Sequence, residues 1–371
     1  MAKCYTKEYE YNLVLLNENF DNTYHDGVSR YASEFHKALN NVKQKHEIIS
    51  TDYLSKYKNV YFRYIDTRIK VTKELEKIKN LRVLHLIKPE SIFFVPKVVP
   101  NDAILIISWH DLIRINYFEN KPFPQNNGKS SPSFYYHHFL KGYIRAYEMS
   151  SHIFAVSTLT AIEINEWARR SNVYDNTKSI VVANPGINYN FIKSQPYYGP
   201  RRDFIYLGTL LKAPKLLYTF HKVLSRLPNQ KLYIFTQFKE ANAFIVNEIK
   251  KNNWGNMLPN IIVHVNSSDD EIIDKLRQSV ALLHIVDVEG FGSTILESLA
   301  LGTPVIVPKQ AKITPEVSKY TFKLDHEDIA VFCEQLYLSQ APVEQRAIAY
   351  AKSFSYENTA QSFKSIYEKY L

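Results

Sequence analysis

The sequence VEGFGSTILESLALGTPVIVP, from Val288 to Pro308, is the most informative segment of the chain about its fold. An apolar run of strand type (280–286) precedes it, and a second one (304–307) lies at its end. Between them, Gly290-Phe291-Gly292 predicts a tight turn, and Ser293-Thr294 predicts the start of a helix. A strand, a glycine turn and a helix N-terminus in succession form a cradle for phosphate in an α/β sheet.

Two glutamates, Glu289 and Glu297, stand eight residues apart in this stretch. An ionised carboxylate only accepts hydrogen bonds, so it suits the hydroxyl groups of a sugar. A phosphate cradle with two carboxylates therefore indicates a nucleotide-sugar. Each glutamate also has a structural interpretation: Glu289 is then a solvated residue at a strand end, and Thr294-x-x-Glu297 is a capping box. Because strand ends bind ligands in open α/β sheets, we favour function for Glu289 and leave both interpretations open for Glu297.

The rest of the chain repeats an α/β pattern. Apolar runs typical of buried parallel strands occur at 12–16, 83–87, 103–108, 153–156 and 180–183, and then at 204–207, 231–235, 261–265, 280–286 and 305–307. Helical segments separate most of these runs, as βαβ connectivity requires. The sequence therefore predicts two Rossmann-like domains that face each other across a cleft.

At 371 residues, two domains are the default expectation. We expect an N-terminal domain at 1–188, a linker at 189–202 that contains Gln-Pro and Gly-Pro pairs, and a C-terminal domain at 203–353. Residues 354–371 predict a final amphipathic helix.

The composition narrows the class of protein. Apolar residues make up 45% and charged residues 22%, which excludes a disordered chain. Cys4 and Cys333 are far apart and suggest no disulfide framework, so a reducing compartment is expected. The first 20 residues contain no apolar segment of signal-peptide type, and no run reaches the roughly 18 apolar residues of a membrane span. We therefore expect a cytoplasmic protein.

The net charge of +9 is concentrated between Lys37 and Lys88, where 13 Lys and Arg face 5 Asp and Glu. The segment 68–82, RIKVTKELEKIKNLR, predicts a basic amphipathic helix with Ile69, Leu75, Ile78 and Leu81 as its apolar residues. A solvated face with Glu–Lys pairs is the favoured interpretation. A peripheral contact with an anionic membrane or an acidic acceptor is the alternative. No nucleic-acid motif accompanies the charge, so we expect no nucleic acid as partner.

The run EGFGSTILESLALGTPVIVP resembles the E-x7-E signature of retaining GT-B glycosyltransferases in glycosyltransferase family 4. That signature usually reads E-G-F-G-L-P-x-L-E-A-x-A-x-G-T-P-V-I, and Ser293-Thr294 stands here in place of Leu-Pro. The resemblance implies that Glu289 lies beside the donor sugar and that Glu297 accepts from the ribose hydroxyls. It also implies that the turn Gly290, Phe291 and Gly292, with the N–H groups of Ser293 and Thr294, belongs to the donor site.

The likeness extends along the chain. Asp26-Gly27-Val28-Ser29-Arg30-Tyr31 is similar to the family's N-terminal glycine loop, where Gly27 lets the backbone approach a phosphate or sugar. Trp109-His110-Asp111-Leu112 resembles an H-D-L motif whose histidine contacts the donor sugar, so His110 and Asp111 are catalytic candidates. Pro315-Glu316-Val317 matches the family's P-E-V. The final helix resembles the family's tail, which returns to the first domain.

One departure concerns the diphosphate. The family commonly shows G-T-L-x-x-R-K-N after the first strand of the second domain, and Ala213 and Pro214 occupy the Arg-Lys positions here. A cation is needed because the nucleoside diphosphate leaves with growing negative charge. We expect Lys215 to supply it. For Lys212 the choice between this role and that of a solvated loop lysine stays open.

No metal motif is convincing. His137-His138 has no partner at ligand spacing, and Asp287-Val288-Glu289 only mimics a metal-binding carboxylate pair. We expect no metal and no cofactor beyond the donor, because lysines and a helix N-terminus supply the electrostatic stabilisation.

We therefore predict a cytosolic, membrane-peripheral, retaining glycosyltransferase. It moves a hexose from GDP-mannose or a UDP-hexose to a hydroxyl of a glycan or lipid-linked glycan acceptor. The alternative is a non-catalytic nucleotide-sugar-binding protein with the same fold, suggested by the missing Arg-Lys pair. An NAD-dependent dehydrogenase is disfavoured, because no G-x-G-x-x-G follows a predicted first strand.

Overall fold

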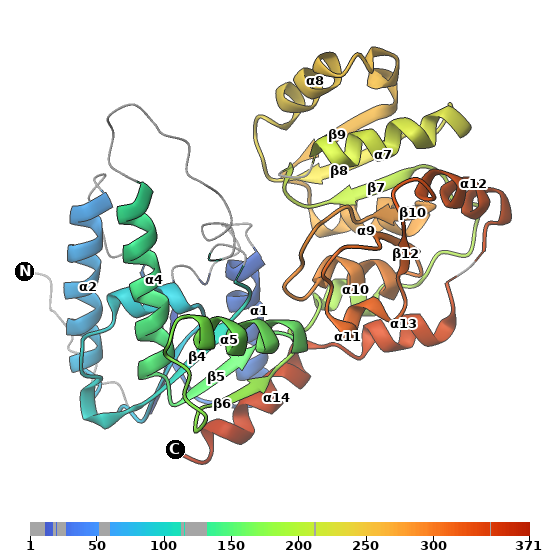
Figure 1. The fold of residues 1–371 in the computed structure, drawn as a ribbon. Coiled ribbons are helices and arrows are strands. Elements are labelled where there is room, and N and C mark those ends of the chain that lie inside the picture. The colour runs from blue at the N-terminus through green and yellow to red at the C-terminus, as the bar shows by residue number, and fades with distance from the viewer. Residues whose placement is uncertain are drawn as a thin grey trace, which may run out of the picture. The chain divides into compact units, whose positions relative to one another are not determined.

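The computed structural model describes residues 12–17, 20, 27–51, 60–112, 115, 132–210, 213–341 and 343–371, apart from the side chains of 60–64, 132–138 and 213. The chain divides into two compact units, each an α/β layer structure (Figure 1). Unit 1 contains Met1–Pro185 and Tyr356–Leu371, and unit 2 contains Gly186–Ser355.

A parallel sheet forms the centre of unit 1, and its order within the described residues is β2-β1-β3-β4-β5-β6. In chain order the elements are β1 (Leu13–Asn17), α1 (Gly27–Asn41), β2 (Glu47–Ser50), α2 (Val60–Glu76), β3 (Val83–Leu86), η2 (Pro89–Phe94), η3 (Pro100–Asp102), β4 (Ile104–Trp109), α4 (Pro132–Met149), β5 (His152–Ala155), α5 (Thr158–Arg170), β6 (Ser179–Val182) and α14 (Tyr356–Tyr367). Alternate strand residues point to opposite faces, so Leu84 belongs to the hydrophobic cluster that includes residues of α2, α4 and α5, whereas Val83 belongs to the cluster with residues of α1 and α14.

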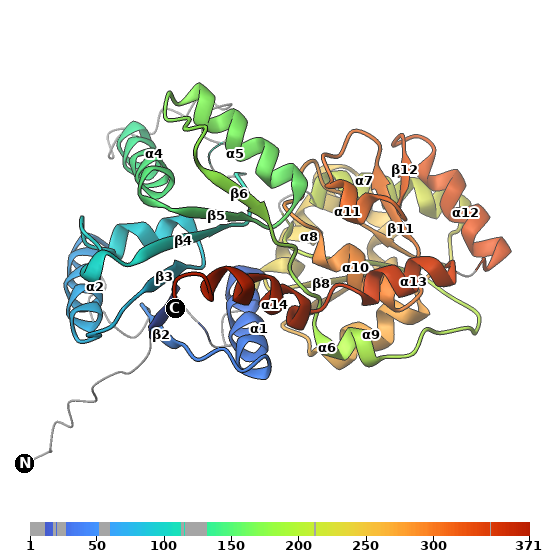
Figure 2. The ribbon, with the colours of Figure 1, turned by 90° about the horizontal axis from the view of Figure 1, so that it is seen from below.

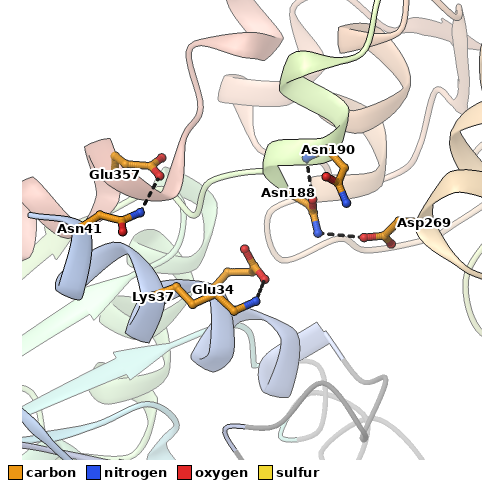
Figure 3. Close-up of polar contacts among 7 residues, drawn as sticks. All are labelled: Glu34, Lys37, Asn41, Asn188, Asn190, Asp269 and Glu357. Carbon is orange, nitrogen blue, oxygen red and sulfur yellow. Dashed lines mark hydrogen bonds and ion pairs between the residues drawn. The ribbon is translucent and has the colours of Figure 1, made fainter.

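Helix α14 completes the core of unit 1, although it is the last element of the chain. Figure 2 shows it alongside α1, and Phe363 and Tyr367 are fully buried in the core that the two helices share. Asn41 at the end of α1 donates to Glu357 at the start of α14, at 3.4 Å (Figure 3). The face of the sheet under α1 is therefore closed only when the C-terminal residues return to it.

The sheet of unit 2 has the order β12-β11-β10-β7-β8-β9 within the described residues. Its elements in chain order are α6 (Tyr189–Lys193), β7 (Phe204–Leu207), α7 (Ala213–Arg226), β8 (Leu232–Thr236), α8 (Ala241–Lys251), η5 (Gly255–Asn260), β9 (Ile261–Val265), α9 (Asp269–Gln278), β10 (Ala281–Leu283), α10 (Ser293–Ala300), β11 (Val305–Pro308), α11 (Pro315–Ser318), β12 (Phe322–Leu324), α12 (Ile329–Ser339) and α13 (Gln345–Lys352). Helices α7, α8 and α12 cover one face, and α9, α10 and α13 lie on the other (Figure 1).

The entry to unit 2 is held by side-chain capping. Asn188 accepts from the backbone N–H of Asn190 at the start of α6 and donates to Asp269 of α9 at 2.9 Å (Figure 3). Residues 189–202, which the sequence presents as a linker, thus include a short helix.

Four differences from the sequence predictions concern element bounds. Strands β2 and β12 were not predicted, because they are short edge strands without a continuous apolar run. Strand β10 ends at Leu283 and not at 286, because the backbone turns where Val286 donates to the carbonyl of His284. Helix α2 spans Val60–Glu76, so the predicted helix at 68–82 is confirmed over 68–76 and is wrong beyond Glu76. Of its predicted apolar residues, Leu75, Ile78 and Leu81 are buried, but Ile69 is 49% exposed.

Within the described residues, no helix is both long and apolar enough to cross a membrane.

Candidate active site

The donor-site residues predicted in unit 2 lie at the carboxyl ends of two central strands of its sheet. Strands β7 and β10 are neighbours, and the chain continues from β7 toward β8 and β9 but from β10 toward β11 and β12. Ligands of open α/β sheets bind at the carboxyl ends of strands where the order reverses in this way. Lys215 follows β7, and the segment from Glu289 to Thr294 follows β10.

The backbone around Glu289 is fixed by a short parallel bridge. The N–H of Glu289 donates to the carbonyl of Lys312 at 2.9 Å, and the N–H of Lys312 donates to the carbonyl of Asp287 at 2.8 Å. The Glu289 side chain is 29% exposed, and its Oε2 lies 3.1 Å from Nε2 of His284. The carboxylate is therefore accessible but held in place.

The charge of Glu289 also reaches Tyr206 on β7. Tyr206 is buried, and its hydroxyl donates to the carbonyl of Thr209. Burial first, and then the negative charge of Glu289, raise the pKa of Tyr206 to about 12. The neutral hydroxyl group of Tyr206 on β7 therefore lies within electrostatic reach of the Glu289 carboxylate in the loop after β10.

The glycine turn begins α10. Gly292 is its N-cap with φ of 90°, in the left-handed region that glycine adopts most easily. A Cβ at Gly292 would lie 3.1 Å from Ile295 and 3.3 Å from Cγ of Glu289, so these neighbours would have to give by a few tenths of an ångström to admit one. The N–H groups of Ser293 and Thr294 occupy the first two helical positions, which have no acceptor in their own helix. They are suited to an anion.

Glu297 does not cap its helix. The N-cap of α10 is Gly292, and Thr294 is the second helical residue, so the capping-box interpretation of Thr294-x-x-Glu297 is wrong. The physical reason is that the helix begins at Ser293, which places Glu297 beyond the first turn. Glu297 is only 4% exposed.

Lys215 lies in the first turn of α7, and its Nζ is 2.6 Å from Oδ1 of Asp287. Both side chains are exposed, so the ion pair lies at the surface of the strand edge. Lys212 lies outside the described residues.

The remaining predicted residues belong to unit 1. His110 follows β4, and its Nε2 lies 2.9 Å from the carbonyl of Ile87, which follows β3. The ring of Tyr31 packs edge-to-face with His110 at 4.7 Å between centroids. Asp111 is half-buried beside it. Gly27 begins α1, and no described atom lies within 4 Å of the position of a Cβ there.

Three residues at the edge of unit 2 were missed as site residues by the sequence reasoning. His284 lies in the apolar run 280–286, Tyr206 lies in the apolar strand FIYL, and Asp287 was considered only as part of a metal motif. A polar residue at the end of a buried strand is the signal that could have found His284 and Tyr206. Within the described part of the chain, no three His, Cys, Asp or Glu side chains gather as a metal-binding group.

Comparisons with known proteins agree with this geometry. Residues 190–330 match the family model described as glycosyl transferases group 1, which covers the strand edge described above. This match supports a glycosyltransferase. No curated protein matches the chain.

Solved structures resemble nearly the whole chain. A glycosyltransferase from Rickettsia africae is 16% identical with a TM-score of 0.67, covering 97% of this chain and 99% of that one. A sucrose-phosphate synthase from Thermosynechococcus elongatus is 12% identical with a TM-score of 0.71, covering 96% and 98%. HepE from Anabaena, in complex with UDP and glucose, is 12% identical with a TM-score of 0.65, covering 97% and 100%. These likenesses establish the GT-B fold, with two α/β units.

Proposed function

We propose that this chain is a retaining glycosyltransferase of the family 4 type, which transfers a hexose from a nucleotide-sugar to a hydroxyl group. One observation carries the proposal. A partly exposed carboxylate, Glu289, lies at the strand-order reversal of unit 2, in the same loop as the N-terminus of α10 and as Asp287, the partner of Lys215. The group 1 match over residues 190–330 supports the assignment.

The residues have distinct roles in this proposal. The N–H groups of Ser293 and Thr294 and the ammonium of Lys215 bind the donor diphosphate and stabilise its charge as it leaves. Glu289 lies beside the donor sugar, with Gly290, Phe291 and Gly292 shaping the turn. Glu297 accepts from the ribose hydroxyls. For His110, Asp111 and Gly27 of the N-terminal domain we propose the roles that the resemblance implies, namely contact with a sugar and close approach of the backbone.

The donor is GDP-mannose or a UDP-hexose, and the acceptor is a glycan or lipid-linked glycan that binds the N-terminal domain. HepE, which has the same fold, was solved with UDP and glucose, and this supports a nucleotide-sugar donor. The acceptor proton passes to an oxygen of the leaving phosphate, since no second carboxylate is assigned as a base. We propose that no metal takes part. Peripheral contact with an anionic membrane through the basic segment at 68–82 is part of the same proposal.

A donor panel tests this function. UDP-, GDP- and dTDP-hexoses are incubated with the full chain, and release of the nucleoside diphosphate is measured with and without glycan acceptors. Glu289→Gln is expected to lower turnover at least about 100-fold, as expected for a group that acts at the reacting sugar. The anomeric configuration of the product, read by NMR, tests retention. Unchanged turnover in both Glu289→Ala and Lys215→Ala would reject the site.

A non-catalytic binding protein is the second candidate. It is favoured by the ion pair of Lys215 with Asp287 and by Ala213 and Pro214 at the usual Arg-Lys positions. Nucleotide binding without turnover of any donor, across a broad acceptor panel, would support this candidate instead.

A further inference from the structure

His284 is a buried histidine at the point where the chain leaves β10. Its backbone N–H donates to the carbonyl of Ile306 at 2.9 Å, so the residue is still held against β11. Its side chain is 4% exposed, and its neighbours Leu283 and Ile285 are fully buried. Placing an imidazole among such neighbours costs free energy unless its nitrogens are hydrogen-bonded.

Among the residues that the structure describes, the ring has one hydrogen bond, and that bond goes to Glu289. Nε2 of His284 lies 3.1 Å from Oε2 of Glu289. Because an ionised carboxylate only accepts, the proton of this bond belongs to Nε2. Nδ1 is buried and has no hydrogen-bond partner among the described residues.

A second buried histidine shows the contrast. His85 in unit 1 is also fully buried, but both of its nitrogens are bonded, Nδ1 to the Tyr367 hydroxyl at 2.6 Å and Nε2 to the Ser108 hydroxyl at 2.8 Å. His85 therefore joins elements of the core. His284 instead makes its hydrogen bond with the carboxylate of Glu289, in the loop after β10.

The backbone of Glu289 is held separately from its side chain. Its N–H donates to the carbonyl of Lys312 at 2.9 Å. This bond fixes the backbone but does not reach the carboxylate. The bond from His284 is the contact that sets which oxygen faces the protein.

We propose that His284 is a positioning residue for Glu289: it holds Oε2, so that the other carboxylate oxygen is presented to the donor sugar. This inference rests on the proposed function, since it requires Glu289 to act on the sugar. A displacement of about 1 Å at a reacting group can cost about 100-fold in rate, so the loss of this bond has a measurable effect.

The experiment compares His284→Leu, which removes the donor, with His284→Gln, whose amide N–H can replace it. His221→Leu is the matched control, because His221 lies on α7 and stacks on Trp254. For the full chain we measure kcat and KM for the active donor, the affinity for UDP and GDP, and the thermal midpoint. His284→Leu is expected to lower kcat by about 10- to 100-fold with the nucleoside diphosphate affinity within about twofold of wild type. His284→Gln is expected to recover most of kcat.

A structural measurement accompanies the kinetics. Long-range ¹H–¹⁵N NMR of the histidine rings, assigned by the signal lost in His284→Gln, is expected to show a proton on Nε2 of His284 and to change in Glu289→Gln. A kcat within twofold of wild type in His284→Leu, while Glu289→Gln is inactive, would overturn the positioning role and leave the proposed function intact. A wild-type chain that neither binds nor turns over any nucleotide-sugar would overturn both.

Discussion

Nζ of Lys215 lies 2.6 Å from Oδ1 of Asp287, two residues before Glu289. The contact joins the first turn of α7 to the loop after β10. An anion that binds Lys215 must therefore share this cation with Asp287 or displace the carboxylate. The pair is exposed, and such pairs contribute only about 0–1 kcal/mol to stability, so displacement costs little.

Asp287→Asn is expected to tighten the binding of the nucleoside diphosphate by up to about fivefold, because it frees Lys215 and removes a repelling charge. Lys215→Met is expected to weaken that binding by about tenfold or more, through loss of a charge-assisted hydrogen bond. Calorimetric titration with UDP and GDP measures both. Lys222→Met is the control on the same helix, since Lys222 pairs with Glu327. Weaker binding in Asp287→Asn would show that Asp287 does not compete with the ligand.

Gly292→Ala is expected to destabilise unit 2 by at least about 1–2 kcal/mol, because φ is 90° and the added Cβ would crowd Ile295, Val317 and Glu289. It should also lower turnover, since Glu289 must move. Urea unfolding and the donor assay measure the two effects. Gly255→Ala is the matched control, because nothing lies within 4 Å of its Cβ position. Equal stability losses in the two variants would contradict the steric argument.

The buried His85 predicts loss of stability in acid. Burial first, and then the charge of His110, lower the pKa of His85 from 6.5 to about 3. In the unfolded chain His85 binds a proton below about pH 6.5, whereas in the folded chain it binds this proton only below about pH 3. The contribution of His85 is thus fully present above pH 6.5 and is lost as the pH falls toward 3, at up to about 1.4 kcal/mol per pH unit.

His85→Asn removes this titration, so its free energy of unfolding should fall less steeply than that of wild type between pH 6 and pH 4. Urea titrations monitored by the hydrogen exchange of the β3 amides report on unit 1 specifically. Parallel slopes for the two proteins would show that His85 is protonated in the folded state at these pH values.

Phe363→Ala is expected to cost unit 1 about 3–5 kcal/mol, because a fully buried aromatic ring is removed from α14. The ring packs against Phe35 at 4.7 Å and Phe154 at 3.9 Å between centroids. Gln361→Ala, on the exposed side of the same helix, should change stability by less than about 0.5 kcal/mol. Differential scanning calorimetry measures both. A small effect of Phe363→Ala would mean that α14 is not an integral part of the core.

Much of the fold was predictable from the sequence for a local reason. Buried parallel strands are continuous apolar runs, and ten of these runs lie on strands of the two sheets. The edge strands β2 and β12 were not predicted, because a strand that pairs with a neighbour on one side only does not need a continuous apolar run. Likewise, the glycine turn before α10 was predicted because only a few residue types suit a left-handed N-cap.

The α/β class and the placement of Glu289, Gly292 and the start of α10 after a strand could be predicted from the amino-acid sequence, because they depend on periodicity and on neighbouring residues. Which side chains meet depends on the tertiary structure. The pairs His284–Glu289 and Lys215–Asp287, and the packing of α14 beside α1, join residues through the strand order of a sheet or the return of the chain end. Chain folding sets such distances, and local sequence patterns do not encode them. For the same reason, Glu297 proved to lie inside its helix and not at its cap.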